Sequence, residues 1–420
     1  MPISLVTSRA EKVMERCRKL ASFSEDDKSL RRTFLCPPMR DCHREIGRWM
    51  QAIGIEGNLD AAGNLRGLYP SDKPNAPRLL IGSHLDTVPN AGAYDGILGA
   101  VLSITLLEEL RGRRLPFDIE AIGFSEEEGV RFGIPFIGSR ALVGRLDREL
   151  LNASDANGIT VQQALQDFGL NPSEIPRAQI SSNAFAYLEF HIEQGPVLES
   201  LNLPLAAVES IAGQTRLEFT FMGRANHAGT TPMNLRHDAL AGAGEWITAV
   251  ESFAAMSAGL VATVGKIEAL PGAANIIPAI VRASLDLRHS SDQVRHHSVE
   301  ALKSQARDIA SRRGLSVSCC ILLDQAAVAM DPFLVKQTEM AIGKTQCQPH
   351  CMVSGAGHDA MILAEKVPAA MVFLRSPGGI SHDPAESVAA GDVEKAIECG
   401  LHLLHQLASS PEFYGRINRA

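Results

Sequence analysis

The sequence contains no apolar segment long enough to cross a membrane as a helix. No run approaches the roughly 18 consecutive apolar residues that such a helix needs. The opening segment, MPISLVTSRAEKVMERCRKL, also lacks the apolar core of a secretory signal peptide. We therefore expect a soluble, cytoplasmic protein that does not act at a membrane.

The cysteines form no CxxC pair and no regular framework. They stand at positions 17, 36, 42, 319, 320, 347, 351 and 399. Scattered thiols in a chain of this length argue against a disulfide framework and favour a reducing compartment.

Basic residues are not in excess. The chain has 40 Lys+Arg against 48 Asp+Glu, a net charge of −8, and no basic stripe. Because nucleic-acid-binding proteins normally carry such a stripe, we expect no nucleic-acid partner. Some of the acidic side chains could be metal ligands, and bound cations would then offset their charge.

The chain has 420 residues, which predicts more than one domain. After an N-terminal third that we interpret as helical, strands and helices alternate. We expect strands at Arg78–Ser83, Phe117–Phe124, Ala186–Ile192 and Ala369–Leu374, and helices at Gly96–Arg111, Pro332–Ile342 and Val393–Leu407. This alternation predicts an α/β domain with a mainly parallel central sheet.

The middle of the chain has a different pattern. Polar and apolar residues alternate in Arg216–Met222, Leu260–Lys266 and Val281–Arg288, and helical stretches occupy His237–Phe253 and Asp292–Ser311. Half-buried strands with two helices predict a separate α+β domain inserted into the first. We place the catalytic domain at residues 1–210 and 326–420, and the insert at 211–325.

Polar side chains follow the first of the predicted parallel strands. His84 and Asp86 stand in the segment SHLDTVP, and Asp95 follows in YDG at the start of a helix. The carboxyl ends of parallel strands are where α/β proteins gather ligand-binding groups. His84 could bind a metal with Asp86 orienting its ring, or it could be an ordinary loop histidine. Asp95 could bridge two cations, or it could simply cap the helix.

Three further polar groups follow the other predicted strands. Glu126, Glu127 and Glu128 come directly after Phe117–Phe124, where three adjacent carboxylates repel one another and need cations or solvent. His191 stands where Ala186–Ile192 ends, and His382 follows Ala369–Leu374. A solvated acidic turn and structural histidines are the alternative.

Their common placement favours a metal centre. His84, Asp95, Glu128, His191 and His382 all fall at junctions between a strand and a loop. Imidazole and carboxylate ligands suit Zn²⁺, and also Mn²⁺, Co²⁺ or Ni²⁺. Five ligands with one shared carboxylate match two ions about 3.5–4 Å apart.

The combined motifs resemble those of a known family. HLDTV, DG, EEEGVRF, HIEQG, NHAGTTP, GAGHDA and SHDPAE are similar to the ureido-hydrolase branch of the M20 metallopeptidase superfamily, which contains allantoate amidohydrolases, N-carbamoyl-L-amino-acid hydrolases and β-ureidopropionases. The resemblance extends from about Asp60 to Val388. It implies an α/β domain that binds two metal ions, an inserted lid and dimerisation domain, and a homodimer.

By position, the resemblance implies a role for each candidate. One ion would bind His84, Asp95 and His191, and the second would bind Asp95, Glu128 and His382. Glu127 matches the general base, and Asp86 matches the residue that orients the first histidine. The histidine at position 191, where peptidase members usually have an acidic residue, favours the ureido-hydrolase branch.

The resemblance also implies substrate-binding residues. His227 would polarise the scissile carbonyl from the partner subunit, although NHAGTTP alone reads as a simple turn. Gln214, Asn275, Arg288, Gly357 and His358 match positions that bind substrate. Arg288 would clamp a carboxylate with its planar guanidinium, or it could form a salt bridge at the strand end.

These inferences predict a hydrolase of ureido substrates that carry a carboxylate. Glu127 would take a proton from water as the water attacks the ureido carbonyl, and ammonia would leave. Allantoate is the first candidate, with N-carbamoyl-L-amino acids and N-carbamoyl-β-alanine as others. The alternatives are an aminoacylase or dipeptidase of the same superfamily, a non-catalytic metal-binding homologue, and a structural dimer without a site.

Overall fold

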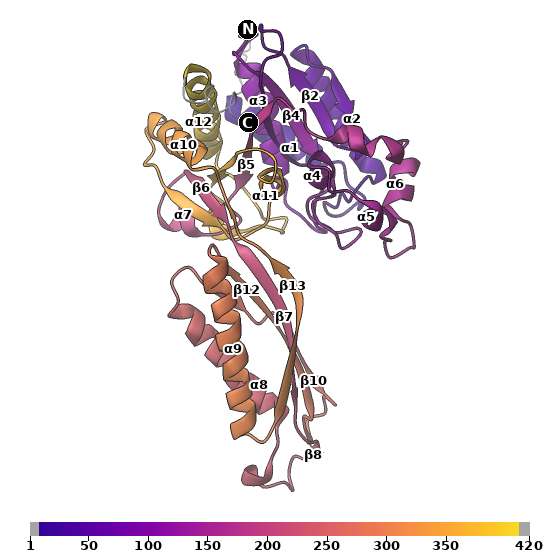
Figure 1. Cartoon of the computed structure of the whole chain (residues 1–420), viewed down its shortest axis with the longest axis vertical. Helices are drawn as coiled ribbons and strands as arrows, with labels where there is room; N and C mark the ends of the chain where they lie inside the picture. Colours follow the sequence, from indigo (N-terminus) through magenta and orange to yellow (C-terminus); the bar gives the residue numbers. More distant parts are fainter. Residues whose placement is uncertain (1–7, 411–420) are drawn as a thin grey trace, which may run out of the picture. The chain divides into compact units, whose positions relative to one another are not determined.

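The computed structural model describes residues 8–410 (Figure 1). Contacts divide the chain into two compact units. The first unit contains the residues up to Glu209 and those from Met330 onward, and we name it the catalytic unit after the sequence prediction. The second, Ser210–Ala329, is here the inserted unit. Between residues 8 and 410, no helix combines the length and apolar character needed to cross a membrane.

The catalytic unit is built on one mixed sheet, in which the described strands number nine. Their order is β1-β2-β4-β3-β5-β16-β6-β14, and β15 pairs with β6. The strands are β1 (Gly57–Leu59), β2 (Leu65–Tyr69), β3 (Arg78–His84), β4 (Asp118–Phe124), β5 (Ala184–Ile192), β6 (Leu205–Ile211), β14 (Val328–Ala329), β15 (Cys351–Ser354) and β16 (Ala369–Leu374). By residue number, β14 and the last two residues of β6 belong to the inserted unit.

The four central strands confirm the prediction of a parallel sheet. Strands β4, β3, β5 and β16 are parallel neighbours. On either side of them, β2 pairs antiparallel with β4 and β6 pairs antiparallel with β16. Because the central strands are parallel, their carboxyl ends and the loops that follow lie along one edge.

Helices pack against this sheet and against one another. Helix α3 (Ile97–Glu109) contacts β3, β4 and β5, and it packs with α1 (Arg9–Ala21) and α12 (Ala390–Ser409). Every residue of α3 from Ile97 to Leu107 is buried. A Cβ on Gly99 would lie 2.0 Å from the carbonyl oxygen of Phe190, so the absence of a side chain lets α3 approach β5 closely.

The remaining helices of the catalytic unit are shorter or more peripheral. They are α2 (Pro37–Ala52), α4 (Ile137–Leu142), α5 (Arg148–Asn152), α6 (Val161–Asp167), α7 (Val197–Ser200), α10 (Pro332–Lys344) and α11 (Asp359–Leu363), with 3₁₀ turns η1 (Pro172–Ala178) and η3 (Pro377–Gly379).

The inserted unit contains a second, antiparallel sheet covered by helices on one face. The order is β10-β12-β7-β13, with β9 on β12, and helices α8 (Ala239–Ala255) and α9 (Asp292–Arg312) pack against β7 and β12. The strands are β7 (Gly213–Met222), β9 (Val261–Thr263), β10 (Ile267–Leu270), β12 (Ile280–His289) and β13 (Ser316–Gln325). Trp246 of α8 lies 4.3 Å from Phe219, ring centre to ring centre, in the buried core.

A small two-stranded ladder lies beyond one end of this sheet. Strand β8 (Asn226–His227) pairs with β11 (Ile276–Ile277). The 3₁₀ turn η2 (Met233–Leu235) follows β8 in the chain.

Some sequence predictions are wrong in detail. The N-terminal third is not wholly helical, since β1 and β2 form a hairpin after α2. The strand expected at Leu260–Lys266 is only the short β9, and β10 begins after it. Strand β13 was not predicted, because most of its residues are exposed on an edge strand and so show no alternation.

Candidate metal centre

The five predicted metal ligands lie around the carboxyl ends of the central strands. His84 is the last residue of β3 and His191 lies near the end of β5. Glu128 follows β4, His382 follows β16, and Asp95 precedes α3. Asp95 does not cap α3, because the N-cap residue is Gly96.

We use the term donor group for a set of side chains whose atoms could bind one metal ion. The first donor group comprises His84, Asp95 and His191, all buried. The Nε2 atoms of the two histidines lie 3.3 Å apart. Asp95 Oδ1 lies 3.6 Å from Nε2 of His84 and 3.2 Å from Nε2 of His191. The two Nε2 atoms and Asp95 Oδ1 therefore surround one point, where all three could bind a metal ion.

The second group of donors shares Asp95. Its other oxygen, Oδ2, lies 3.2 Å from Nε2 of His382. That nitrogen lies 3.6 Å from Oε1 of Glu128. His84, Glu127 and Glu128 form a further compact group, so the base candidate Glu127 lies beside both sets of donors.

The hydrogen bonds of the two buried histidines test whether these donors fit a cation. Nδ1 of His84 lies 3.1 Å from the carbonyl oxygen of Asp86, and Nδ1 of His191 lies 2.9 Å from that of Ile192. Carbonyl oxygens only accept, so Nδ1 carries the proton in each neutral ring and Nε2 presents a lone pair. Asp95 Oδ1 is buried and accepts no hydrogen bond in the described structure. Inward-facing lone pairs of nitrogen and oxygen fit divalent cations.

The electrostatics of the site agree with that fit. Burial raises the pKa of Glu127 well above its usual value, and burial with the nearby Asp95 raises the pKa of Glu128 to about 7. Burial would also raise the pKa of Asp95, but the surrounding imidazoles of His191, His382 and His84 hold it well below its usual value. Several acids are thus crowded into one buried region, where cations would stabilise their charged forms.

Asp86 joins the first histidine to the acidic loop. Its Oδ1 accepts the backbone N–H of Glu127 at 2.9 Å and its Oδ2 accepts that of Glu128 at 3.1 Å. Oδ1 also lies 3.4 Å from Nδ1 of His84. The carboxylate therefore fixes the loop that carries Glu127 and Glu128 relative to β3.

Two residues at this centre have a strained backbone conformation. His382 and Gln194 have φ of 57° and 60°, in the left-handed region that most residues avoid. Gly96 also has positive φ, and a Cβ there would lie 2.4 Å from the ring of His84. Such strain clusters at functional sites, where the surrounding structure enforces it.

Two residues at the centre were not assigned a role from the sequence. Nε2 of Gln194 donates to Asp95 Oδ2 at 3.0 Å. Glu386 is buried, and its carboxylate accepts the backbone N–H groups of Tyr94 and Asp95. Both stand inside the quoted motifs HIEQG and SHDPAE, so their closeness to His191 and His382 in the sequence was the available signal.

His358 lies in the protein interior beside His191, and Gly357 precedes it in the chain. His358 is buried, its ring centre is 4.4 Å from that of His191, and its Nε2 lies 2.9 Å from Oγ of Ser354. Gly357 lies against Phe136, where a Cβ would approach the ring to 3.0 Å. This geometry favours a packing role beside His191 for His358 over direct contact with a substrate.

Within the inserted unit, two of the predicted substrate residues lie together. Gln214 and Arg288 are register partners on β7 and β12. Both donate to Asp286, Arg288 through Nε at 2.8 Å. Arg288 thus forms the ion pair considered from the sequence.

The other two predicted substrate residues of this unit, His227 and Asn275, lie beyond the opposite end of β7 and β12. His227 is on β8 and the carbonyl of Asn275 accepts the N–H of Ala228 at 2.9 Å. The β7–β12 pairing runs from Arg288 opposite Gln214 to Ile280 opposite Met222. Eight residues at about 3.3 Å each separate these ends by roughly 26 Å. The structure therefore does not bring His227 and Asn275 together with Gln214 and Arg288 in one copy.

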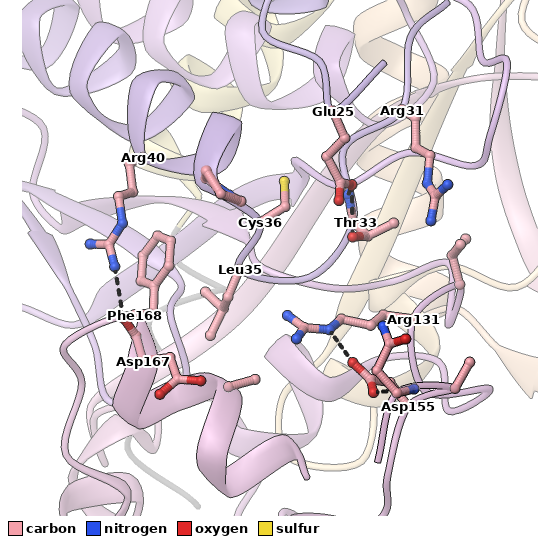
Figure 2. Close-up of a pocket in the computed structure, with 15 residues that line it drawn as sticks. Glu25, Arg31, Thr33, Leu35, Cys36, Arg40, Arg131, Asp155, Asp167 and Phe168 are labelled. Atoms are coloured by element: carbon pink, nitrogen blue, oxygen red, sulfur yellow. Dashed lines mark hydrogen bonds and ion pairs between the residues drawn. The ribbon is translucent and has the colours of Figure 1, made fainter. Parts of the chain in front are cut away.

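A pocket of about 440 Å³ lies beside the acidic loop and contains none of the five candidate ligands (Figure 2). Nε of Arg131 donates to Asp155 at 3.0 Å and its Nη1 donates to the carbonyl of Phe34 at 2.9 Å. Arg40 stacks on Phe168 at 3.9 Å. These contacts join three chain segments and support the loop that carries Glu127 and Glu128.

Comparisons with known proteins identify relatives over most of this chain. The model of peptidase family M20/M25/M40 matches residues 80–407. An allantoate deiminase of Arabidopsis thaliana is 37% identical, covering 95% of this chain and 82% of that protein. An N-carbamoyl-L-amino acid amidohydrolase of Geobacillus stearothermophilus is 38% identical, covering 86% and 90%. The crystal structure of a hydantoinase/carbamoylase family amidase from Burkholderia multivorans has a TM-score of 0.90 at 29% identity, covering 96% and 98%.

Proposed function

Because the chain belongs to peptidase family M20/M25/M40, we propose that it is a metal-dependent amidohydrolase that cleaves a carbon–nitrogen bond of a ureido group and releases ammonia. Relatives named for allantoate and for N-carbamoyl-L-amino acids, both ureido compounds, match most of its length. The observation that carries the proposal is the convergence of two donor groups on the two oxygens of Asp95.

The two donor groups support a centre of two divalent ions. His84, Asp95 and His191 would hold one ion, and Asp95, Glu128 and His382 would hold the other. Zn²⁺ and Mn²⁺ are the first candidates, and Co²⁺ and Ni²⁺ accept the same ligands. When bound, such ions lower the pKa of water and polarise a carbonyl group.

Glu127 is the proposed base. It is buried beside both donor groups, and burial raises its pKa. A carboxylate with a raised pKa takes a proton from water more readily and can return it to the leaving nitrogen. Water attacks the ureido carbonyl as Glu127 takes its proton, ammonia leaves with the returned proton, and the carbamate that remains loses carbon dioxide.

Substrate recognition is assigned to the inserted unit. Arg288 and Gln214 would bind the substrate carboxylate, because a guanidinium makes two parallel bonds to that group. His227 would stabilise the negative charge that develops on the carbonyl oxygen. Gln214 and His227 lie at opposite ends of one inserted unit, so a single copy would not supply both to one small substrate. This separation supports a homodimer in which His227 and Asn275 act on the partner's metal centre.

An ammonia-release assay tests the proposed function. Purified protein with added Mn²⁺ or Zn²⁺ is incubated with allantoate, N-carbamoyl-β-alanine and several N-carbamoyl-L-amino acids. A dipeptide and an N-acetyl amino acid serve as comparisons, and their cleavage is followed by the amino acid that it releases, because neither yields ammonia. We expect ammonia from at least one ureido substrate and no cleavage of the comparisons. Cleavage of the dipeptide or the N-acetyl compound alone would instead identify a peptidase or aminoacylase.

A further inference from the structure

Glu386 lies beside the second donor group and contacts two of the three chain segments that form it. Its Oε1 accepts the backbone N–H of Tyr94 at 2.9 Å and that of Asp95 at 3.0 Å. Its Oε2 lies 3.3 Å from Oγ of Ser381, the residue before His382. The buried carboxylate of Glu386 therefore connects the backbone of Asp95, the shared ligand, with the loop that carries His382.

Ser381 completes the connection. Its Oγ lies 3.2 Å from Asp95 Oδ2, the oxygen that faces His382. Glu386 thus fixes the main chain of Asp95 directly, and the Ser381 hydroxyl, whose single proton can be donated to either carboxylate, lies between the two side chains. A hydrogen-bonded outer partner of this kind fixes the direction in which a metal ligand presents its oxygen.

The two donor groups differ in how firmly the rest of the fold holds them. The side chains of His84 and His191 are 2% and 1% exposed and lie on central strands. The side chain of His382 is 48% exposed, and its residue is on a loop in the left-handed region. Because burial in the sheet does not hold His382, its position depends on the contacts of its loop.

The fit around Glu386 is close. A Cβ on Gly92 would lie 2.3 Å from Cβ of Glu386 and 2.5 Å from its Oε1. The chain from Gly92 to Asp95 therefore wraps around this carboxyl group, and only glycine leaves it room at position 92.

From these contacts we propose that Glu386 is a positioning residue that holds the Asp95–Glu128–His382 group in a shape that binds metal. The inference rests on the proposed metal centre and adds that the two ions depend on Glu386 unequally. Loss of Glu386 weakens the second ion more than the first, which retains two histidines anchored in the sheet.

Three variants distinguish the effects of the Glu386 charge, of its hydrogen bonds and of the space around its carboxyl group. Glu386→Ala removes the acceptors, and we expect it to weaken the second ion by about 10- to 100-fold, the usual effect of losing such a partner. Glu386→Gln keeps an amide oxygen for the two N–H groups and should rescue much of that loss. Gly92→Ala displaces the carboxyl group without removing it and should resemble Glu386→Ala. Glu398→Gln, on the surface of α12 with its ion pair to Lys395, is the matched control.

The experiment is a calorimetric titration of the metal-free, full-length protein with Mn²⁺, paired with Co²⁺ absorption spectra. We expect two binding steps in the native protein and in Glu398→Gln. In Glu386→Ala and Gly92→Ala the first step should persist, and the second should weaken with loss of its share of the Co²⁺ spectrum. Circular dichroism identifies any variant that does not fold, in which case the other carries the test.

Each outcome decides the inference. A second step of native affinity in the folded variants, or an equal weakening of both steps, would overturn the role of Glu386. Absence of any binding by the native protein would instead overturn the proposed function, so the two failures are distinguishable.

Discussion

The Nε2 atoms of His84 and His191 lie 3.3 Å apart, and the Nδ1 atom of each ring faces a backbone carbonyl. With the protons on Nδ1, the two Nε2 lone pairs face one another across the site. Lone pairs at this separation repel unless a proton or a cation lies between them. The same point faces Asp95 Oδ1, which is buried without a hydrogen bond in the described structure. A cation at this point would satisfy all three atoms.

Replacement of Glu127 by Gln tests the assignment of the base. The amide cannot take a proton from water, and Glu127 is not needed for either three-residue donor group that contains Asp95. We expect kcat to fall by about 100- to 10,000-fold while two ions remain bound. Steady-state kinetics and metal analysis of the same preparation measure both effects. Near-native turnover in this variant would show that another group is the base.

Mixing of two inactive variants tests the shared site. Subunits with His227→Ala lack the group proposed to act on the partner, and subunits with Glu127→Gln lack the base. Random pairing in a homodimer gives half mixed dimers, each with one intact site, and so roughly a quarter of native activity. Activity is measured after the two proteins are exchanged and again without exchange. No recovery after proven exchange would place His227 and Glu127 of one subunit in the same site.

Replacement of Arg288 by Lys tests carboxylate recognition. Lysine keeps the charge but cannot form two parallel bonds, so we expect KM to rise on the order of tenfold or more and kcat to change less. Arg216 also donates to Asp286, at 3.0 Å, and Arg216→Lys is therefore a matched control with near-native KM. Equal effects of the two substitutions would mean that the cluster at Asp286 is structural.

His43 predicts a pH dependence of stability that is independent of the metal centre. It is buried on α2, both ring nitrogens lack a hydrogen-bond partner among the described residues, and burial lowers its pKa from 6.5 to about 3. Between these values the unfolded chain binds a proton that the folded chain does not, so the free energy of unfolding falls as the pH is lowered.

His43→Phe should remove this dependence while keeping the ring contact with Phe168. From pH 7.5 to pH 5 we expect the native protein to lose about 2 kcal/mol more than the variant. Urea unfolding of both proteins at the two pH values measures the difference. Parallel losses would show that His43 is protonated in the folded protein as well.

The central strands of the catalytic unit and the polar residues at their ends could be predicted from the sequence, because both are visible in short segments of the chain. The apolar segment at β3 is bounded by polar residues and leads directly into His84, and β5 leads in the same way to His191. Once such strands are taken as parallel, the loops after them must meet at one edge. The strand ends therefore predict that five residues dispersed from position 84 to position 382 lie close together.

Features that depend on tertiary contacts could not be predicted in this way. The separation of His227 from Arg288 follows from the register of β7 with β12, which alternation alone does not fix. Strand β13 has exposed Ile321 and Leu322 on an edge, so its pattern resembles neither a buried nor a half-buried strand. The role of Glu386 depends on a fold that brings it beside Asp95, far away in the sequence.

Anomalous diffraction from crystals grown with Mn²⁺ tests the central claim most directly, because it locates each ion relative to its ligands. We expect two peaks per subunit, about 3.5–4 Å apart, one beside His84 and His191 and the other beside Glu128 and His382, with Asp95 between them. A single peak, no peak, or ions bound away from Asp95 would contradict the account.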